Sequence, residues 1–89
     1  MKKLLFVDDE QQVLDFLRVS LRALADEWQM EFVPSAERAL RILAQGPVDV
    51  LLADIHLDGA SGIALLQGVK AQYPHTVRIA FSGAAGQDT

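Results

Sequence analysis

Residues 50–54 read Val-Leu-Leu-Ala-Asp, a short apolar run that ends in an acid. Consecutive apolar side chains alternate between the two sides of a strand, so such a run is expected in a central strand covered by helices on both faces. Shorter or similar runs occur at residues 4–7 (Leu-Leu-Phe-Val), 30–33 (Met-Glu-Phe-Val) and 77–81 (Val-Arg-Ile-Ala-Phe). The sequence therefore predicts four short strands, at residues 4–7, 30–33, 48–53 and 77–81.

Longer stretches with apolar side chains at helical spacing separate these runs. The first covers residues 11–25, with its apolar stripe at Val13, Leu14, Leu17, Leu21 and Leu24. The second begins after the N-cap Ser35, ends at Gly46 and Pro47, and is predicted to bury Ala36, Ala39, Leu40 and Leu43. The third, marked by Ile63, Leu66 and Val69, ends near Tyr73 and Pro74. This alternation predicts an α/β domain with a doubly wound parallel sheet.

Composition limits the kind of protein. The 89 residues suffice for one small domain, and the net charge of -4 with eight scattered Lys and Arg argues against a nucleic-acid surface. There is no cysteine, which excludes disulfides and Cys-based zinc sites. The apolar run at residues 4–7 is too short for a signal peptide, and no run approaches the roughly 18 apolar residues of a membrane span. We therefore expect a cytoplasmic domain without membrane contact.

Polar residues follow three of the predicted strands. Asp8 and Asp9 follow the first strand, Asp54 ends the third, and Ser82 follows the fourth. Parallel strands joined by right-handed crossovers have their carboxyl ends on one side of the sheet, where doubly wound folds bind ligands. If the first and third strands are neighbours, Asp8 and Asp54 lie in one cluster, since adjacent strands are about 4.8 Å apart.

Two carboxylates about 4 Å apart repel by roughly 4 kcal/mol at an effective dielectric of 20. A raised pKa on one acid could offset this repulsion, and so could Mg²⁺, which prefers oxygen ligands. A bound Mg²⁺ would leave one carboxylate able to attack phosphorus. The alternative is that these acids are solvated caps, since acids are common at strand ends and helix starts, and Asp9 and Glu10 favour the positive end of the following helix dipole. Ser82 is equally explained as a turn residue, and the His56 and His75 side chains as solvated loop residues.

Residues 6–10 (Phe-Val-Asp-Asp-Glu), 50–54 (Val-Leu-Leu-Ala-Asp) and 78–83 (Arg-Ile-Ala-Phe-Ser-Gly) together resemble the strand signatures of response-regulator receiver domains. The resemblance implies a flavodoxin-like receiver fold with strand order 2-1-3-4. It also implies that the domain is a phosphoacceptor, which takes its phosphoryl group from a sensor histidine kinase and switches an output domain. Such a domain is not an enzyme in the ordinary sense. Ser82 and Gly83 follow the predicted fourth strand and are part of the matching signature.

The resemblance assigns roles residue by residue. Asp54 matches the phosphoacceptor, and Asp8 and Asp9 match the acidic pair that holds Mg²⁺ together with Asp54. His56 matches the residue whose backbone carbonyl is a metal ligand. Ser82 matches the switch hydroxyl that bonds the phosphoryl group, and Ala84 matches the position that influences access of the hydrolytic water.

The sequence departs from the family pattern in two ways, and each departure leads to an expectation. The loop at residues 57–62, Leu-Asp-Gly-Ala-Ser-Gly, keeps the glycines of the family motif but lacks its proline and Met-Asp pair. Family members also continue with a fourth helix, a fifth strand bearing a lysine, and a fifth helix, so residues 1–89 are expected to be a receiver domain incomplete at its C-terminus. Lys70 cannot replace that lysine, because it lies on the third helix. Phosphorylation of this chain is then expected to be slow or absent, and its apolar edge strand to form a homodimer or domain-swapped dimer.

Other functions remain open. The fold could serve as a phosphorylation-independent dimerisation or docking module. Residues 28–32 and the approach to Ser82 are similar to receivers that precede HD-superfamily domains of the HDOD type, although DNA-binding and cyclic-dinucleotide outputs also fit. A flavin site is disfavoured, because it requires a loop of backbone NH groups where this chain has acids. A metal-dependent phosphatase is the remaining alternative.

Overall fold

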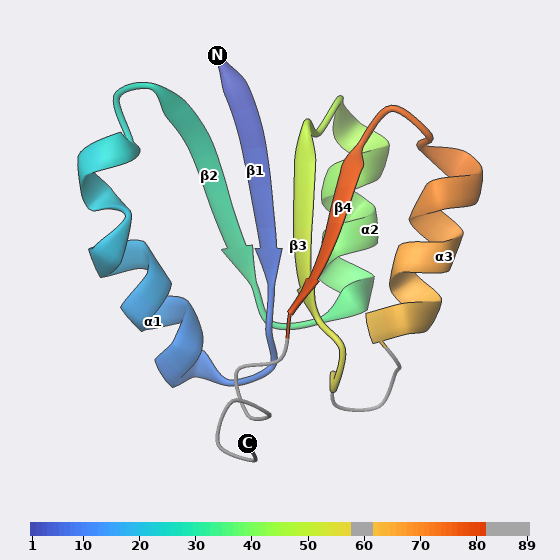
Figure 1. Ribbon diagram of the computed structural model, residues 1–89, viewed down its shortest axis with the longest axis horizontal. Helices are drawn as coiled ribbons and strands as arrows, with labels where there is room; N and C mark the ends of the chain where they lie inside the picture. The colour runs from blue at the N-terminus through green and yellow to red at the C-terminus, as the bar shows by residue number, and fades with distance from the viewer. Residues whose placement is uncertain (58–61, 82–89) are drawn as a thin grey trace.

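The four strands form one parallel sheet in the order β2-β1-β3-β4, which confirms the predicted fold class and strand order (Figure 1). The computed structural model describes residues 1–57 and 62–81. Along the chain the elements are β1 (Lys2–Val7), α1 (Gln11–Ser20), a short 3-10 helix η1 (Arg22–Leu24), β2 (Trp28–Val33), α2 (Ala36–Gln45), β3 (Val50–Asp54), α3 (Gly62–Gln72) and β4 (Val77–Phe81). Among the described helices, none is long and apolar enough to cross a membrane.

One face of the sheet carries the main core. Leu5 and Leu51 lie opposite each other on β1 and β3 and are fully buried. Helices α2 and α3 cover this face, and they contribute the buried residues Ala39, Leu43, Leu65 and Val69. Burial of apolar area stabilises the fold by roughly 25 cal/mol per Å², so this cluster is the main source of its stability. The rigid core supports the carboxyl ends of the central strands.

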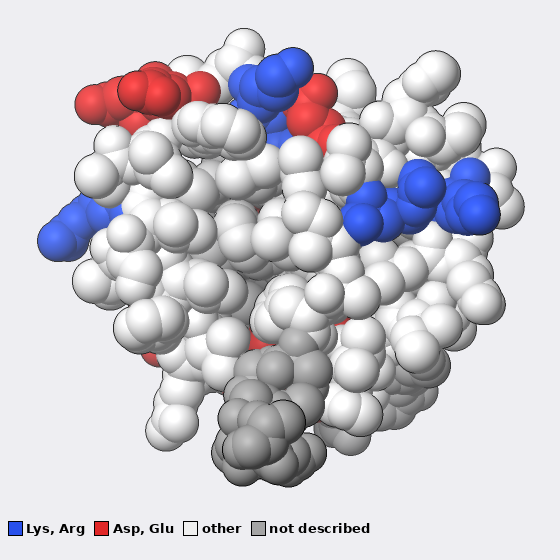
Figure 2. All heavy atoms as spheres, viewed as in Figure 1, with Lys and Arg blue, Asp and Glu red and all other residues white. Residues whose placement is uncertain are grey.

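The opposite face is only partly covered. Helix α1 packs there through Leu14, its one fully buried residue. Toward β4 the side chains of Val77 and Ile79 are 56% and 44% exposed. A cavity of about 450 Å³ lies between α1 and the sheet and is lined by Phe6, Gln12, Val13, Phe16, Leu17, Leu52 and Phe81. Figure 2 shows that uncharged side chains occupy the centre of the visible face.

Three sequence predictions about the helices need correction: the extent of one helix and the burial of two residues. The stretch 11–25 is not one helix: α1 ends at Ser20, and the 3-10 turn η1 follows, because β2 begins at Trp28 and the chain must reverse before it. Leu40 and Ile63, predicted to be buried, are 42% and 52% exposed. The predicted Ala39 and Leu43 of α2 and Val69 of α3 are buried, so only these two positions of the faces predicted for α2 and α3 turn toward solvent.

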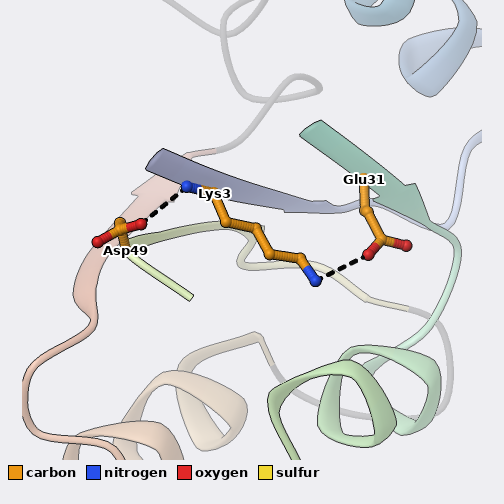
Figure 3. A network of polar contacts seen from close by, with 3 residues as sticks. All are labelled: Lys3, Glu31 and Asp49. Atoms are coloured by element: carbon orange, nitrogen blue, oxygen red, sulfur yellow. Dashed lines mark hydrogen bonds and ion pairs between the residues drawn. The ribbon is translucent and has the colours of Figure 1, made fainter. Parts of the chain in front are cut away.

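The start of α2 and the amino ends of the strands are fixed by polar contacts. The hydroxyl of Ser35 accepts a hydrogen bond from the backbone N–H of Arg38 at 3.2 Å, which confirms the predicted N-cap. At the opposite end of the sheet from the acids, the backbone N–H of Lys3 donates to Oδ2 of Asp49 at 2.8 Å, and Lys3 Nζ pairs with Glu31 at 3.0 Å (Figure 3). These contacts hold β1 in register between β2 and β3.

Candidate functional site

The site lies at the carboxyl ends of β1 and β3, which point to the lower edge of the sheet in Figure 1. The two strands are parallel neighbours, with Val7 opposite Ala53. Asp8 and Asp54 are the next residues on each strand and therefore emerge side by side. The predicted adjacency of the first and third strands is confirmed, and with it the meeting of two acids that lie 46 positions apart (54 minus 8) in the sequence.

The two acids are held in the same way. Oδ1 of Asp8 accepts a hydrogen bond from the backbone N–H of Glu10 at 2.8 Å. Oδ1 of Asp54 accepts one from the backbone N–H of His56 at 3.0 Å. In each case the acid binds the N–H two residues later, which is the Asx-turn pattern. Each turn fixes the rotation of its carboxylate and leaves the second oxygen for another partner.

The second oxygen of Asp8 is buried without a partner. The Asp8 side chain is fully buried, and its Oδ2 has no hydrogen-bond partner among the described residues. Burial raises the pKa of Asp8 above its ordinary value of 3.8; the Glu10 N–H opposes that rise, and the charges of Asp54, Glu10 and Asp9 add to it. A buried oxygen without a partner is costly unless something pairs with it, so this atom is suited to pair with a cation or a proton.

A third acid joins the cluster. One carboxylate oxygen from each of Asp8, Glu10 and Asp54 lies within 4.8 Å of the others. Glu10 is the N-cap residue of α1, but its side chain makes no capping hydrogen bond, so it is available at the end of the strand. Sequence reasoning treated Glu10 only as a favourable charge at the helix start and missed its place in the site. Its position directly after Asp8 and Asp9 was the only available signal.

These residues fit a magnesium ion. Mg²⁺ takes oxygen ligands at 2.0–2.1 Å in octahedral geometry, so opposite ligands lie about 4.2 Å apart. One oxygen from each of the three acids lies within 4.8 Å of the others, and Asp8 also has an Oδ2 without a hydrogen-bond partner among the described residues. Mg²⁺ usually keeps several waters, which can complete a shell begun by one or two carboxylates. The donor set is therefore that of a hard divalent cation.

The remaining predicted site residues lie outside the acidic cluster or outside the described part of the chain. Asp9 is half-buried next to the cluster, but its carboxylate is not among the three that gather, and its metal role stays a prediction. The His56 side chain is exposed, and the role of its backbone carbonyl also stays a prediction. Lys70 lies on α3, as expected. Ser82 and Ala84 lie outside the described residues, so their predicted roles stay untested.

Comparisons with known proteins agree on one family. Residues 4–89 match the response regulator receiver domain family. The hydrogenase transcriptional regulatory protein HoxA of Cupriavidus necator is 39% identical over 79 residues, which cover 89% of this chain and 16% of HoxA. The chain thus spans about a sixth of the length of that relative.

Solved structures give the same result. The signal receiver domain of an HD domain-containing protein from Pseudomonas fluorescens superposes with a TM-score of 0.86 at 33% identity, covering 92% of this chain and 64% of that one. The response regulator TrrA of Thermotoga maritima, solved in complex with the histidine kinase ThkA, superposes with a TM-score of 0.82 at 24% identity over 93% of this chain and 70% of that structure's chain. The second likeness concerns the fold alone. With the matching family, strand order and acidic cluster, this chain belongs to the response regulator receiver domain family.

Proposed function

We propose that this chain is a phosphoacceptor module, in which Asp54 receives a phosphoryl group from a sensor histidine kinase with the help of Mg²⁺. The observation that carries the proposal is the pair of carboxylates from neighbouring strands, of which Asp8 is fully buried and has an oxygen that no described residue pairs with. Solvated caps, the simpler reading of these acids, would not be buried together. Asp54 itself is only 3% exposed.

The chemistry follows from this arrangement. A carboxylate oxygen of Asp54 attacks phosphorus, the bond from phosphorus to the donor nitrogen or oxygen breaks, and the electron pair leaves with the donor. The product is an acyl phosphate on Asp54. The His56 N–H keeps the Asp54 carboxylate oriented during the attack, and Asp8 and Asp54, joined by Glu10, would hold the ion. A bound Mg²⁺ would neutralise charge on the transferring group and shield it from the acids.

Partners follow from the same proposal. The complex of TrrA with ThkA supports a histidine kinase as the phosphoryl donor. HoxA is a transcriptional regulator, and the Pseudomonas fluorescens protein contains an HD domain, so both offer classes of output to which such a module can be joined. The choice between these outputs and the cytoplasmic location both stay predictions.

Borohydride trapping tests the acceptor. We expect acetyl phosphate and Mg²⁺ to add one phosphoryl group to a chain extended by the segment that family members carry after the fourth strand, and to label the 89-residue chain more slowly. Borohydride reduces the acyl phosphate, so peptide mapping by mass spectrometry should find homoserine at position 54. Omitting Mg²⁺ should abolish the label, because the acids then repel the anionic donor.

Two variants make this test specific. Asp54→Asn should remove the label, whereas Asp15→Asn, which changes an exposed acid on α1, should keep it. A label that persists in Asp54→Asn, or homoserine at another position, would show that Asp54 is not the acceptor. No label in the extended chain, with kinase binding intact, would favour the docking module over the phosphoacceptor.

A docking role has its own support, and we include it as a second candidate function. Val77 and Ile79 of β4, with Phe16 of α1 at 68% exposure, leave apolar surface open on one face of the sheet. β4 is also an edge strand of the described sheet, and exposed edges favour pairing with another chain. We expect a homodimer of the 89-residue chain in light scattering at high concentration. A monomer over the whole concentration range would contradict this expectation.

A further inference from the structure

We propose that Gly62 is a positioning residue for the Asp54 site. The first residue of α3 lies against the main chain that follows β3: a Cβ built on Gly62 would collide with the carbonyl oxygen of Asp54 and would come within 2.7 Å of Cα of Ile55. Real Cβ atoms essentially never approach other atoms this closely. Only glycine allows α3 to begin at this place.

The collision involves backbone atoms, so it cannot be relieved by rotating a side chain. The main chain at Asp54 is fixed by the sheet, since the N–H of Ile55 donates to the carbonyl of Phe81 at 2.9 Å. Helix α3 is fixed from the other side by Leu65 and Val69, which are buried in the core. A side chain at position 62 must therefore displace either the acceptor strand or the helix.

Gly62 also bonds the turn that orients the acceptor. Its N–H donates to the carbonyl of Ile55 at 3.2 Å, and Ile55 is the middle residue of the turn in which the His56 N–H binds Oδ1 of Asp54. A shift of this turn changes the direction of the Asp54 carboxylate relative to Asp8. Gly62 thus acts through the turn, without itself belonging to the acidic cluster.

The chain offers a matched control on the same helix. Gly68 has no atom within 4 Å of a built Cβ, and it is exposed. Gly68→Ala therefore adds the same methyl group to α3 without a collision, and it should favour the helix, because alanine is a better helix former than glycine. Any effect of Gly62→Ala beyond that of Gly68→Ala reports on the contact with Asp54 and Ile55.

The test combines NMR with Mg²⁺ titration. In the folded Gly62→Ala variant we expect the amide resonance of His56 to move in the absence of Mg²⁺, and Mg²⁺ affinity to fall by about tenfold to a hundredfold, as when other groups that orient metal ligands are changed. Gly68→Ala should match the wild type in both measurements. If Gly62→Ala is unfolded, both are repeated with trimethylamine N-oxide, which favours the compact state.

Each outcome bears on the inference, which rests on the proposed Mg²⁺ site for its second readout only. An unshifted His56 amide with Mg²⁺ affinity within about twofold of Gly68→Ala would overturn the positioning role and leave the phosphoacceptor proposal standing. A shifted amide in a protein whose wild type binds no Mg²⁺ would support the positioning role and overturn the metal site. A variant that stays unfolded even with the osmolyte would show that Gly62 serves the whole fold, and would also overturn the inference.

Discussion

We expect Asp8→Asn to raise the melting temperature of the metal-free protein by about 5 to 15 °C, corresponding to about 1 to 3 kcal/mol for a domain of this size. The native Asp8 is fully buried, one of its oxygens lies within 4.8 Å of two other carboxylates, and its Oδ2 has no partner among the described residues. Asparagine removes the charge, keeps an oxygen for the Glu10 N–H, and offers an amide donor toward Asp54. The like-charge repulsion and the cost of burying a charge then disappear.

The same variant should have a characteristic pH dependence. The pKa of Asp8 is raised in the folded state, so between 3.8 and that raised pKa the folded protein holds the proton more tightly than the unfolded chain does. The contribution of Asp8 to stability therefore falls as pH rises through this window. The melting-temperature advantage of Asp8→Asn should be small near pH 3.8 and largest at neutral pH.

Mg²⁺ should offset the stability advantage of Asp8→Asn. A ligand that binds only the folded state at 100 times its Kd stabilises it by about 2.7 kcal/mol, which the wild type should gain, whereas Asp8→Asn should gain less because it binds the ion more weakly. Asp15→Asn is the control, since Asp15 is 60% exposed and its loss should change stability by no more than about 0.5 kcal/mol. An Asp8→Asn variant that is less stable than the wild type without metal would contradict the strained acidic cluster.

Leu51→Ala is expected to cost about 2 to 5 kcal/mol of the free energy of unfolding. Leu51 is fully buried on β3, between β1 and β4 and beneath α2 and α3. Its truncation leaves a cavity that the surrounding strands cannot close without moving. Since a small domain has only about 5 to 15 kcal/mol of net stability, the variant should be close to unfolding at 37 °C.

Leu40→Ala is the matched control for Leu51→Ala. Leu40 is the same residue type, but it lies on α2 with 42% of its surface exposed, and alanine favours a helix. We expect it to cost less than about 1 kcal/mol. Urea unfolding followed by circular dichroism measures both. Equal losses for the two variants would show that the core does not lie on the α2 and α3 face.

The fold could be predicted from the sequence because its strands are short apolar runs with no competing pattern. The strand predicted at residues 48–53 overlaps β3 (Val50–Asp54), and the strand predicted at residues 77–81 has the same bounds as β4. Helix faces were harder. Ala39 and Leu43 were predicted to be buried and are, but Leu40 beside them is 42% exposed. On α3 the glycine at position 62 gave no signal, and Ile63 was named for the buried face in its place.

The site was predicted in part. The meeting of Asp8 and Asp54 follows from strand order, which a repeated βαβ alternation makes predictable. Strand order does not tell which of the next two acids, Asp9 or Glu10, joins the cluster. Both carry a carboxylate, and the direction of each side chain depends on how the chain leaves β1 to begin α1. The Asx turns at Asp8 and Asp54 likewise depend on local dihedral angles that composition does not determine.

The central claim is that Asp8 and Asp54 hold one divalent cation between them, and isothermal titration with Mg²⁺ tests it most directly. The wild type should bind one ion. Asp8→Asn and Asp54→Asn should each weaken binding at least tenfold, and the double variant should lose little more than either single one, because the two ligands serve the same ion. Unchanged Mg²⁺ binding in both single variants would contradict the account.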